Sequence, residues 1–275
     1  MLIDVHAHLN DPKLIESVKE IVEKSRQSGV ERIICSGHNM ASSMLAIQLA
    51  KEFDNVYATI GLHPHSCFEF NKDFETLLKS EINNEKIVGI GEIGLDYFNL
   101  DAQIEEISKN FPNLSLTKEK VIEKQKDVFL KQLELANKYS LPFVIHMRDA
   151  TGETLKLLES HKDLIKNSGL VHCYSGSLET TKRIEELGLY YSIGGSITFK
   201  NSRIMPDVLK EVGIEHVLLE TDCPYLSPEP FRGQTNTPAS IPLIVKKISE
   251  LTNISESEIE KTTTQNAFNL FKRLK

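Results

Sequence analysis

Short apolar runs alternate with longer amphipathic stretches along the whole chain. This alternation is typical of repeated βα units around a parallel sheet. We predict strands near Leu2–Val5, Arg32–Cys35, Val56–Ile60, Lys86–Ile90, Pro142–Ile145, Gly169–Val171, Tyr190–Ile193 and His216–Leu219. Eight such units in 275 residues favour a closed (β/α)8 barrel, usually about 250 residues long, over an open sheet. We therefore expect one α/β domain over residues 1–275, a TIM barrel.

Two segments depart from the plain repeat. A polar, charged stretch separates the fourth strand from its helix between Asn99 and Lys120. We expect an inserted loop there, with room for a short helix, at the mouth of the barrel. The tail from Pro238 carries two helical patterns, and the second opens near Ser255 with Glu258 at the spacing of a capping box. An extra C-terminal helix is therefore predicted.

Composition excludes several classes of protein. Hydrophobic residues make up 40% of the chain and charged residues 26%, which is typical of a folded globular protein. No apolar run approaches the length of a membrane span, and the N-terminus lacks the pattern of a signal peptide, so we expect a cytoplasmic protein without membrane contact. The four cysteines form no CxxC pair, which favours reduced, buried thiols over a zinc finger.

The formal net charge of −7 argues against a protein that coats duplex DNA. Such proteins gain affinity for phosphates from lysines and arginines. A nucleic-acid enzyme is still compatible with this charge, because bound divalent cations supply positive charge locally.

Histidines and acidic residues recur directly after the predicted strands. Seven of the nine histidines follow this rule, since His161 and His216 fall elsewhere. The polar residues at these strand ends are His6, His8, Ser36, His38, His63, His65, Glu92, His146, Arg148, His172 and Asp222. Catalytic residues of (β/α)8 barrels come from this end of the strands. In addition, His6 and His8 are two positions apart and so point to the same side of a strand.

These side chains predict a metal site. A lone histidine on a strand is more often a hydrogen-bonded core or surface group, but crowded imidazoles without a shared cation would be unfavourable. Imidazole with carboxylate suits zinc, manganese, iron or partly hydrated magnesium. Four histidines and two carboxylates are more ligands than one tetrahedral ion can bind. We therefore expect two ions about 3.5–4 Å apart, bridged by Glu92 and a water. Such a water has its pKa lowered to about 7 and becomes a nucleophile.

Six segments together resemble the TatD-type metal-dependent deoxyribonucleases of the amidohydrolase-like superfamily. They are Asp4–His8, Gly61–His65, Gly89–Tyr97, Leu141–Ala150, His172–Gly176 and Glu220–Leu226, and Asn266 and Phe271 in the tail also agree. The resemblance spans essentially the whole chain in the right order. It implies a TIM barrel, two divalent metals (magnesium, manganese or zinc) and hydrolysis of phosphodiester bonds in DNA. The implied activity is a 3′-to-5′ exonuclease on single-stranded ends, with no obligatory protein partner.

The resemblance also implies a role for each residue. It assigns His6 and His8 to one metal, His146 and His172 to the other, Glu92 between them, and Asp222 beside the first metal as general base. The bridging hydroxide would attack phosphorus in line. The candidate substrate-binding residues are His63, His65, Arg148, Asp96, Tyr225, Arg232 and Asn236. Asp96 has an alternative use, which is to orient a histidine ligand from behind.

The chain departs from the family in two places. The family usually has an arginine directly before the asparagine of its Arg-Gly-x-x-Asn segment, where this chain has Thr235 before Asn236. The segment 99–120 is also longer than the resemblance leads us to expect. Both differences concern contacts with substrate.

Two other functions stay open at this stage. A barrel of the same superfamily could hydrolyse a small amide, lactone or phosphoester, although many of those enzymes hold a carboxylated lysine where this chain has Glu92. The rim could alternatively bind nucleotides or a protein without catalysis. Aromatic residues beside the motifs, Tyr97, Phe98, Tyr174 and Tyr225, could stack on bases or pack in the core.

Overall fold

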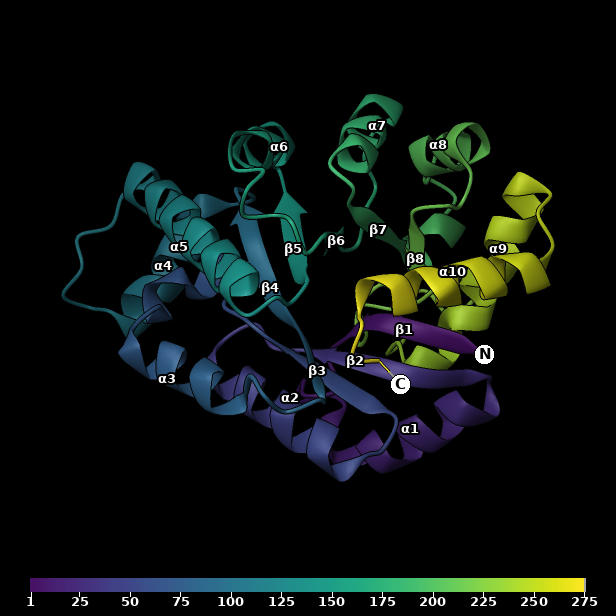
Figure 1. The fold of residues 1–275 in the computed structure, drawn as a ribbon, viewed down its shortest axis with the longest axis horizontal. Helices are drawn as coiled ribbons and strands as arrows, with labels where there is room; N and C mark the ends of the chain where they lie inside the picture. The colour runs from purple at the N-terminus through teal and green to yellow at the C-terminus, as the bar shows by residue number, and fades with distance from the viewer. Residues whose placement is uncertain (275) are drawn as a thin grey trace.

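Eight parallel strands pair in sequence order from β1 to β8 in the computed structural model, which describes residues 1–274 (Figure 1). The strands are β1 (Leu2–Ala7), β2 (Val30–Ser36), β3 (Val56–Ile60), β4 (Ile87–Asp96), β5 (Phe143–Arg148), β6 (Gly169–Val171), β7 (Tyr190–Ile193) and β8 (Val217–Leu219). Just beyond β8, the Asp222 N–H donates to the His6 carbonyl at 2.9 Å and the His8 N–H donates to the Cys223 carbonyl at 2.8 Å. These bonds bring the two ends of the sheet together, so the chain is a nearly closed (β/α)8 barrel, as predicted.

All eight predicted strands are present, and the largest difference lies in β4. This strand continues past Ile90 to Asp96. Its pairing with β5 shifts register between Gly91 and Ile93, and the Glu92 N–H donates to the Gly37 carbonyl at 2.7 Å. Such an irregularity changes the direction of a side chain. Glu92 therefore lies within the strand rather than after it.

Helices cover the outer side of the strands (Figure 1). They are η1 (Ile15–Ser17), α1 (Val18–Gln27), α2 (Met40–Glu52), η2 (Pro64–Glu69), α3 (Lys72–Glu81), α4 (Leu100–Asn110), α5 (Lys118–Lys138), α6 (Thr151–Ser160), α7 (Leu178–Glu186), η3 (Gly195–Thr198), α8 (Ile204–Val212), η4 (Pro238–Ser240), α9 (Ile241–Thr252) and α10 (Glu256–Leu270). Helix α1 shows why these segments are helical: Val18, Ile21, Val22 and Ser25 are buried at the three- and four-residue spacing of one helix face.

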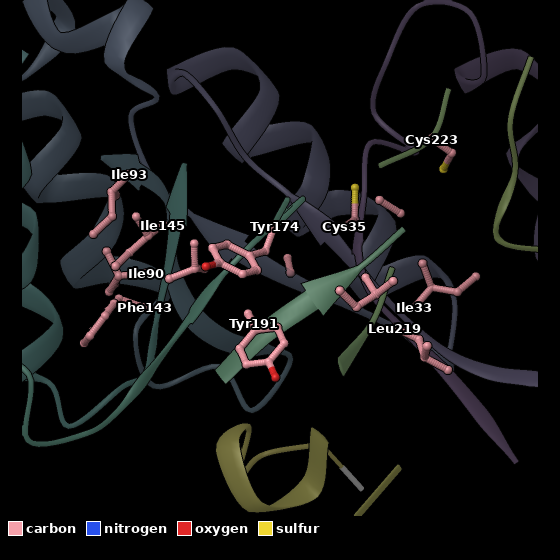
Figure 2. Packing of buried hydrophobic residues seen from close by; sticks show 14 of the residues in the cluster. Ile33, Cys35, Ile90, Ile93, Phe143, Ile145, Tyr174, Tyr191, Leu219 and Cys223 are labelled. Atoms are coloured by element: carbon pink, nitrogen blue, oxygen red, sulfur yellow. The ribbon is translucent and has the colours of Figure 1, made fainter. Parts of the chain in front are cut away.

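The main apolar core lies between the strands and the surrounding helices. Strand residues such as Ile33, Ile145 and Leu219 belong to it, as Figure 2 shows. Helix residues such as Phe129 and Leu133 of α5 complete the same cluster. This layer holds each strand against its helix and so fixes the positions of the strand ends.

A second apolar cluster lies inside the barrel and closes its N-terminal end. It contains Val144, Leu170 and Leu218, each two positions before a polar residue at the opposite end of its strand. Because alternate strand residues share a side, these three point inward like His146, His172 and Glu220. Residues Ala267, Leu270, Phe271 and Leu274, in and just after α10, pack against them. The predicted extra helix therefore seals one end of the barrel and leaves the other for polar groups.

The inserted segment is more regular than expected. Asn99 caps α4 by accepting a hydrogen bond from the Ala102 N–H, and Thr117 caps α5 in the same way. The Gln103 amide of α4 donates to the Phe98 carbonyl at 2.7 Å. This bond holds α4 beside the carboxyl end of β4, so the insertion lies at the mouth of the barrel, where the sequence predicts it.

Two further expectations concern the cysteines and the helices. The four cysteines are free, and three of them are buried, while Cys173 is half-buried. No helix within residues 1–274 has the length and apolar character needed to cross a membrane.

The floor of the barrel can be tested with Phe271→Ala. The Phe271 side chain is fully buried in the inner cluster, so its truncation leaves a cavity under the strands. We expect a loss of about 3–5 kcal/mol in the free energy of unfolding, measured by urea denaturation. The neighbouring exposed Lys272→Ala should change stability by less than about 0.5 kcal/mol. Equal effects of the two changes would contradict the role given to this floor.

Candidate metal centre

Glu92 stands between two pairs of histidines at the open end of the barrel. Its Oε2 lies 3.6 Å from His6 Nε2 and 3.7 Å from His8 Nε2. Its Oε1 lies 2.9 Å from His146 Nδ1 and 2.8 Å from His172 Nε2. Each carboxylate oxygen therefore faces one histidine pair. Strands β1, β4 and β5 and the residues directly after β1 and β6 supply these side chains.

The spacing of the donor atoms fits divalent metal ions. His6 Nε2 and His8 Nε2 are 3.2 Å apart, and Asp222 Oδ1 lies 3.6 and 3.3 Å from them. In the other pair, His146 Nδ1 and His172 Nε2 are also 3.2 Å apart. A tetrahedral ion with ligands at about 2.0–2.1 Å places neighbouring donor atoms about 3.3–3.4 Å apart. Both groups could therefore hold a cation.

Hydrogen bonds behind the rings hold the histidines in place. His6 Nδ1 lies 3.0 Å from Ser36 Oγ, and His8 Nδ1 lies 3.3 Å from the Ser36 carbonyl. His146 Nε2 lies 3.0 Å from Asp96 Oδ2. Such partners set the tautomer of a histidine ligand and its orientation. They leave His6 Nε2, His8 Nε2 and His146 Nδ1 free to face the centre.

Two buried glutamines of α5 position the rim. Gln132 accepts a hydrogen bond from the Leu62 N–H at 2.8 Å and donates to the Leu62 carbonyl at 3.0 Å, directly before His63. Gln125 accepts from the Asp96 N–H at 3.0 Å. Because loop backbone that is fully hydrogen-bonded has little freedom to move, these bonds fix the segments that carry His63 and Asp96.

The position of Asp96 favours one of its two expected uses. Its side chain is buried, and Oδ2 contacts both His146 Nε2 and His65 Nε2, the latter at 3.2 Å. Its Oδ1 accepts from the Phe98 N–H at 2.9 Å. Since the carboxylate lies behind His146 and away from solvent, orientation of that histidine fits better than contact with substrate.

His63 lies closer to the metal-donor group than the sequence predicts. Its Nε2 is 3.8 Å from Glu92 Oε1, and its ring lies edge-on to that of His146 with centroids 4.3 Å apart. His63, Glu92 and His146 together form one of the clusters with metal-ligand spacing. His65 is further out and more exposed, against Asp96. His38, to which the sequence gave no role, lies edge-on to His8 at 5.6 Å.

The charges of the centre depend on burial and on neighbouring groups. Burial raises the pKa of Glu92, but the surrounding histidines, His172 foremost, outweigh it and hold this pKa well below its usual value. Burial and the charge of His172 lower the pKa of His6 well below its usual value. Burial also acts to lower the pKa of His8 and His146, but hydrogen bonds to Asp222 and Asp96, respectively, raise both to about 9.

Glu220 is a buried acid that the sequence analysis left without a role. It is fully buried, accepts a hydrogen bond from Ser192 Oγ at 2.6 Å, and places Oε2 3.8 Å from His172 Nδ1. Burial and the charge of Asp222 raise its pKa well above the usual value. This buried carboxyl lies behind His172. Its place directly after β8 was the available signal, because the other polar residues of the centre also lie at the ends of strands.

The expected substrate contacts divide into exposed and buried residues. Arg148, Tyr225 and Arg232 are exposed at the rim. Asn236 is buried, and its amide donates to the Thr221 carbonyl at 3.0 Å and to the Tyr225 carbonyl at 2.8 Å. These bonds hold the turn that carries Asp222, so the placement of Asn236 favours a positioning role over the substrate contact expected from sequence.

Comparisons with known proteins show which proteins this chain resembles. Residues 3–272 match the family model described as TatD related DNase. An uncharacterized metal-dependent hydrolase of Bacillus subtilis, YabD, is 35% identical over 99% of this chain and 99% of its own. The solved structure of YjjV, a TatD homolog from Escherichia coli, superposes with a TM-score of 0.86 at 28% identity and covers 98% of each chain.

The barrel alone is shared more widely. A β-aspartyl dipeptidase from Fervidobacterium islandicum superposes with a TM-score of 0.64 at 14% identity over 98% of this chain and 74% of its own. At that level of identity the likeness concerns the fold and not the reaction.

The role of Asp96 can be tested with Asp96→Asn. The change removes the charge behind His146 but keeps the size of the side chain, so the ring loses a strong partner. We expect affinity for Zn²⁺ to fall about 10–100-fold, measured by competition with a chromogenic chelator. The exposed Asp163→Asn is the control and should leave affinity unchanged. An Asp96→Asn protein that binds metal as tightly as the wild type would refute the orienting role.

Metal binding should also depend on pH. Neutral imidazole is the form that binds a metal, whereas His8 and His146, with pKa values of about 9, carry protons at pH 7. A metal ion must displace these protons, so affinity should rise as pH increases from 7 to 9, by up to about tenfold per unit for each proton released. Calorimetric titration in two buffers of different ionisation enthalpy measures the released protons. An affinity that is constant over this range would contradict the prediction.

Proposed function

Because the chain belongs to the family of TatD-related DNases and is a metal-dependent hydrolase, we propose that it cleaves phosphodiester bonds of DNA. The finer proposal is a 3′-to-5′ exonuclease that acts on single-stranded ends. One observation supports cleavage of phosphodiester bonds: a single buried carboxylate presents one oxygen to each of two histidine pairs. Sites with two metals in this relation suit displacement at phosphorus.

We assign His6 and His8 to one metal and His146 and His172 to the other, with Glu92 shared between them. When bound, two divalent cations would lower the pKa of a shared water and neutralise charge on the phosphodiester. The contribution of the protein is to fix the donors rigidly, since the rings are held from behind and Glu92 is kept ionised by its neighbours.

Asp222 is the proposed proton acceptor. Its Oδ1 lies within 3.6 Å of both His6 Nε2 and His8 Nε2, yet its side chain is 17% exposed, unlike the fully buried His6. The carboxylate therefore borders both the first metal position and solvent. The bond from the Asp222 N–H to the His6 carbonyl holds it there.

The rim supplies groups that suit a phosphate backbone. Arg148 stacks on the Phe98 ring with its guanidinium carbon 3.8 Å from the centroid, and Arg232 stacks in the same way on Phe199 at 4.2 Å. Neither guanidinium forms an ion pair within residues 1–274. In a chain of net charge −7, unpaired arginines beside an acidic centre indicate an anionic ligand.

The depth of the centre supports single-stranded ends as substrates. His6 and Glu92 are almost inaccessible, and the histidine pairs open only toward the rim. A flexible strand end can enter such a recess, whereas the interior of a stiff duplex cannot do so without distortion. Exposed aromatic rings, Phe98 and Tyr225, stand at the entrance where unpaired bases can stack.

The proposal is tested with an oligonucleotide labelled at its 5′ end and incubated with Mg²⁺, Mn²⁺ or Zn²⁺. We expect stepwise shortening from the 3′ end and loss of activity with a chelator. Asp222→Asn should retain bound metal but reduce turnover by about 10²–10⁴-fold, the usual contribution of general base catalysis. The exposed Asp207→Asn is the control. Hydrolysis of small amides or lactones without any cleavage of DNA would refute the proposal.

A further inference from the structure

A cavity of about 150 Å³ lies between the segments that follow β6 and β7, at the same end of the barrel as the metal centre. Its floor is apolar, because the buried residues Tyr174, Ile197 and Met205 line it. A cavity of this volume accommodates one ring of the size of benzene. None of its lining residues belongs to the groups with metal-ligand spacing, so it is a separate site.

The side chains at the mouth of this cavity are polar and have no hydrogen-bond partner within the described residues. Ser175, Ser196, Asn201 and Ser202 line it, and none of these side chains makes a hydrogen bond within the described part of the chain. Hydroxyl and amide groups both donate and accept hydrogen bonds. An apolar floor below such a mouth suits a flat ring whose edge carries donors and acceptors, which is the description of a nucleobase.

The cavity is within reach of a strand held at the metal centre. Ser175 follows His172 by three residues, so their Cα atoms are at most about 11 Å apart. On the other side, Ser192 of β7 donates to Glu220, which lies behind His172. Because successive nucleotides in a single strand are separated by several ångströms, a base one or two positions from the reacting phosphate can enter the cavity.

Arg232 is held at the edge of the same cavity. It stacks on Phe199, one of the residues that line the mouth. The loop that carries Arg232 is tied to η3, because the Glu229 N–H donates to Thr198 Oγ1 at 2.8 Å. The packing is also close at Gly195, where a Cβ would lie 2.1 Å from the Leu226 carbonyl oxygen. The guanidinium is therefore positioned to hold a phosphate beside the mouth.

We propose that this cavity binds a nucleobase, with a preference for the single ring of a pyrimidine, and that Arg232 holds the adjoining phosphate. The inference rests on the proposed function and deepens it. The enzyme then recognises one base near the scissile bond in addition to binding the backbone. Stacking and the polar mouth make this base contribute to substrate binding.

The test combines protein variants whose cavity is filled and DNA substrates that lack one base. Ser196→Leu and, separately, Ser202→Leu place an apolar side chain in the mouth, and the small diester that joins two abasic deoxyribose units reports the metal chemistry without a base or an aromatic ring. With the wild type, one abasic position among the last three nucleotides should raise KM about tenfold. The filled variants should show this rise with intact DNA, no further rise with the abasic strand, and unchanged hydrolysis of the small diester.

Exposed Ser80→Leu on α3 is the matched control and should behave as the wild type. Wild-type cleavage of DNA that ignores every abasic position would overturn the nucleobase site and leave the proposed function intact. Absence of DNA cleavage by the wild type with any metal would refute both. If a filled variant also loses hydrolysis of the small diester, its metal centre is damaged, and the abasic series with the wild type decides.

Discussion

The structure depends on one buried carboxylate shared by four imidazoles. Removing Glu92 from water is unfavourable by itself, and only the surrounding histidines keep it ionised. The two pairs of rings would repel one another on protonation, yet the carboxylate between them gives each pair a partner. This mutual dependence explains why so many ionisable groups can be gathered in one small recess, and why the recess suits divalent cations.

The rest of the fold makes this arrangement possible by separating two environments. One end of the barrel is filled with apolar side chains and closed by α10 and the residues after it, so water does not reach the strands from below. The other end receives the polar side chains. Buried amides from α5 then fix the strand ends, since Gln125 and Gln132 satisfy backbone groups next to Asp96 and His63. Rigid placement of donors is what a metal centre requires.

The proposed chemistry extends outward from the centre in layers of decreasing burial. The donors His6, His8, Glu92 and His172 are enclosed, Asp222 and His146 are partly exposed, and the arginines with their aromatic partners lie at the rim. This order suits a DNA strand. Its scissile phosphate must be removed from bulk solvent at the centre, while its bases stay in contact with solvent or with a shallow cavity. A recess of this shape distinguishes substrates mainly by the groups that they carry next to the scissile bond. The rim residues of the protein contact those groups.

The sequence by itself determined the eight strands, the extra helix and the identity of the polar residues at the strand ends, because hydrophobic periodicity and chain order are local properties. Only the tertiary structure decided how those residues meet. The irregularity in β4 that turns Glu92 inward, the burial of Asn236, the approach of His63 and the buried Glu220 behind His172 all arise from packing between segments far apart in the chain. Burial and distance determine these roles, and neither quantity can be derived from the local sequence of one strand.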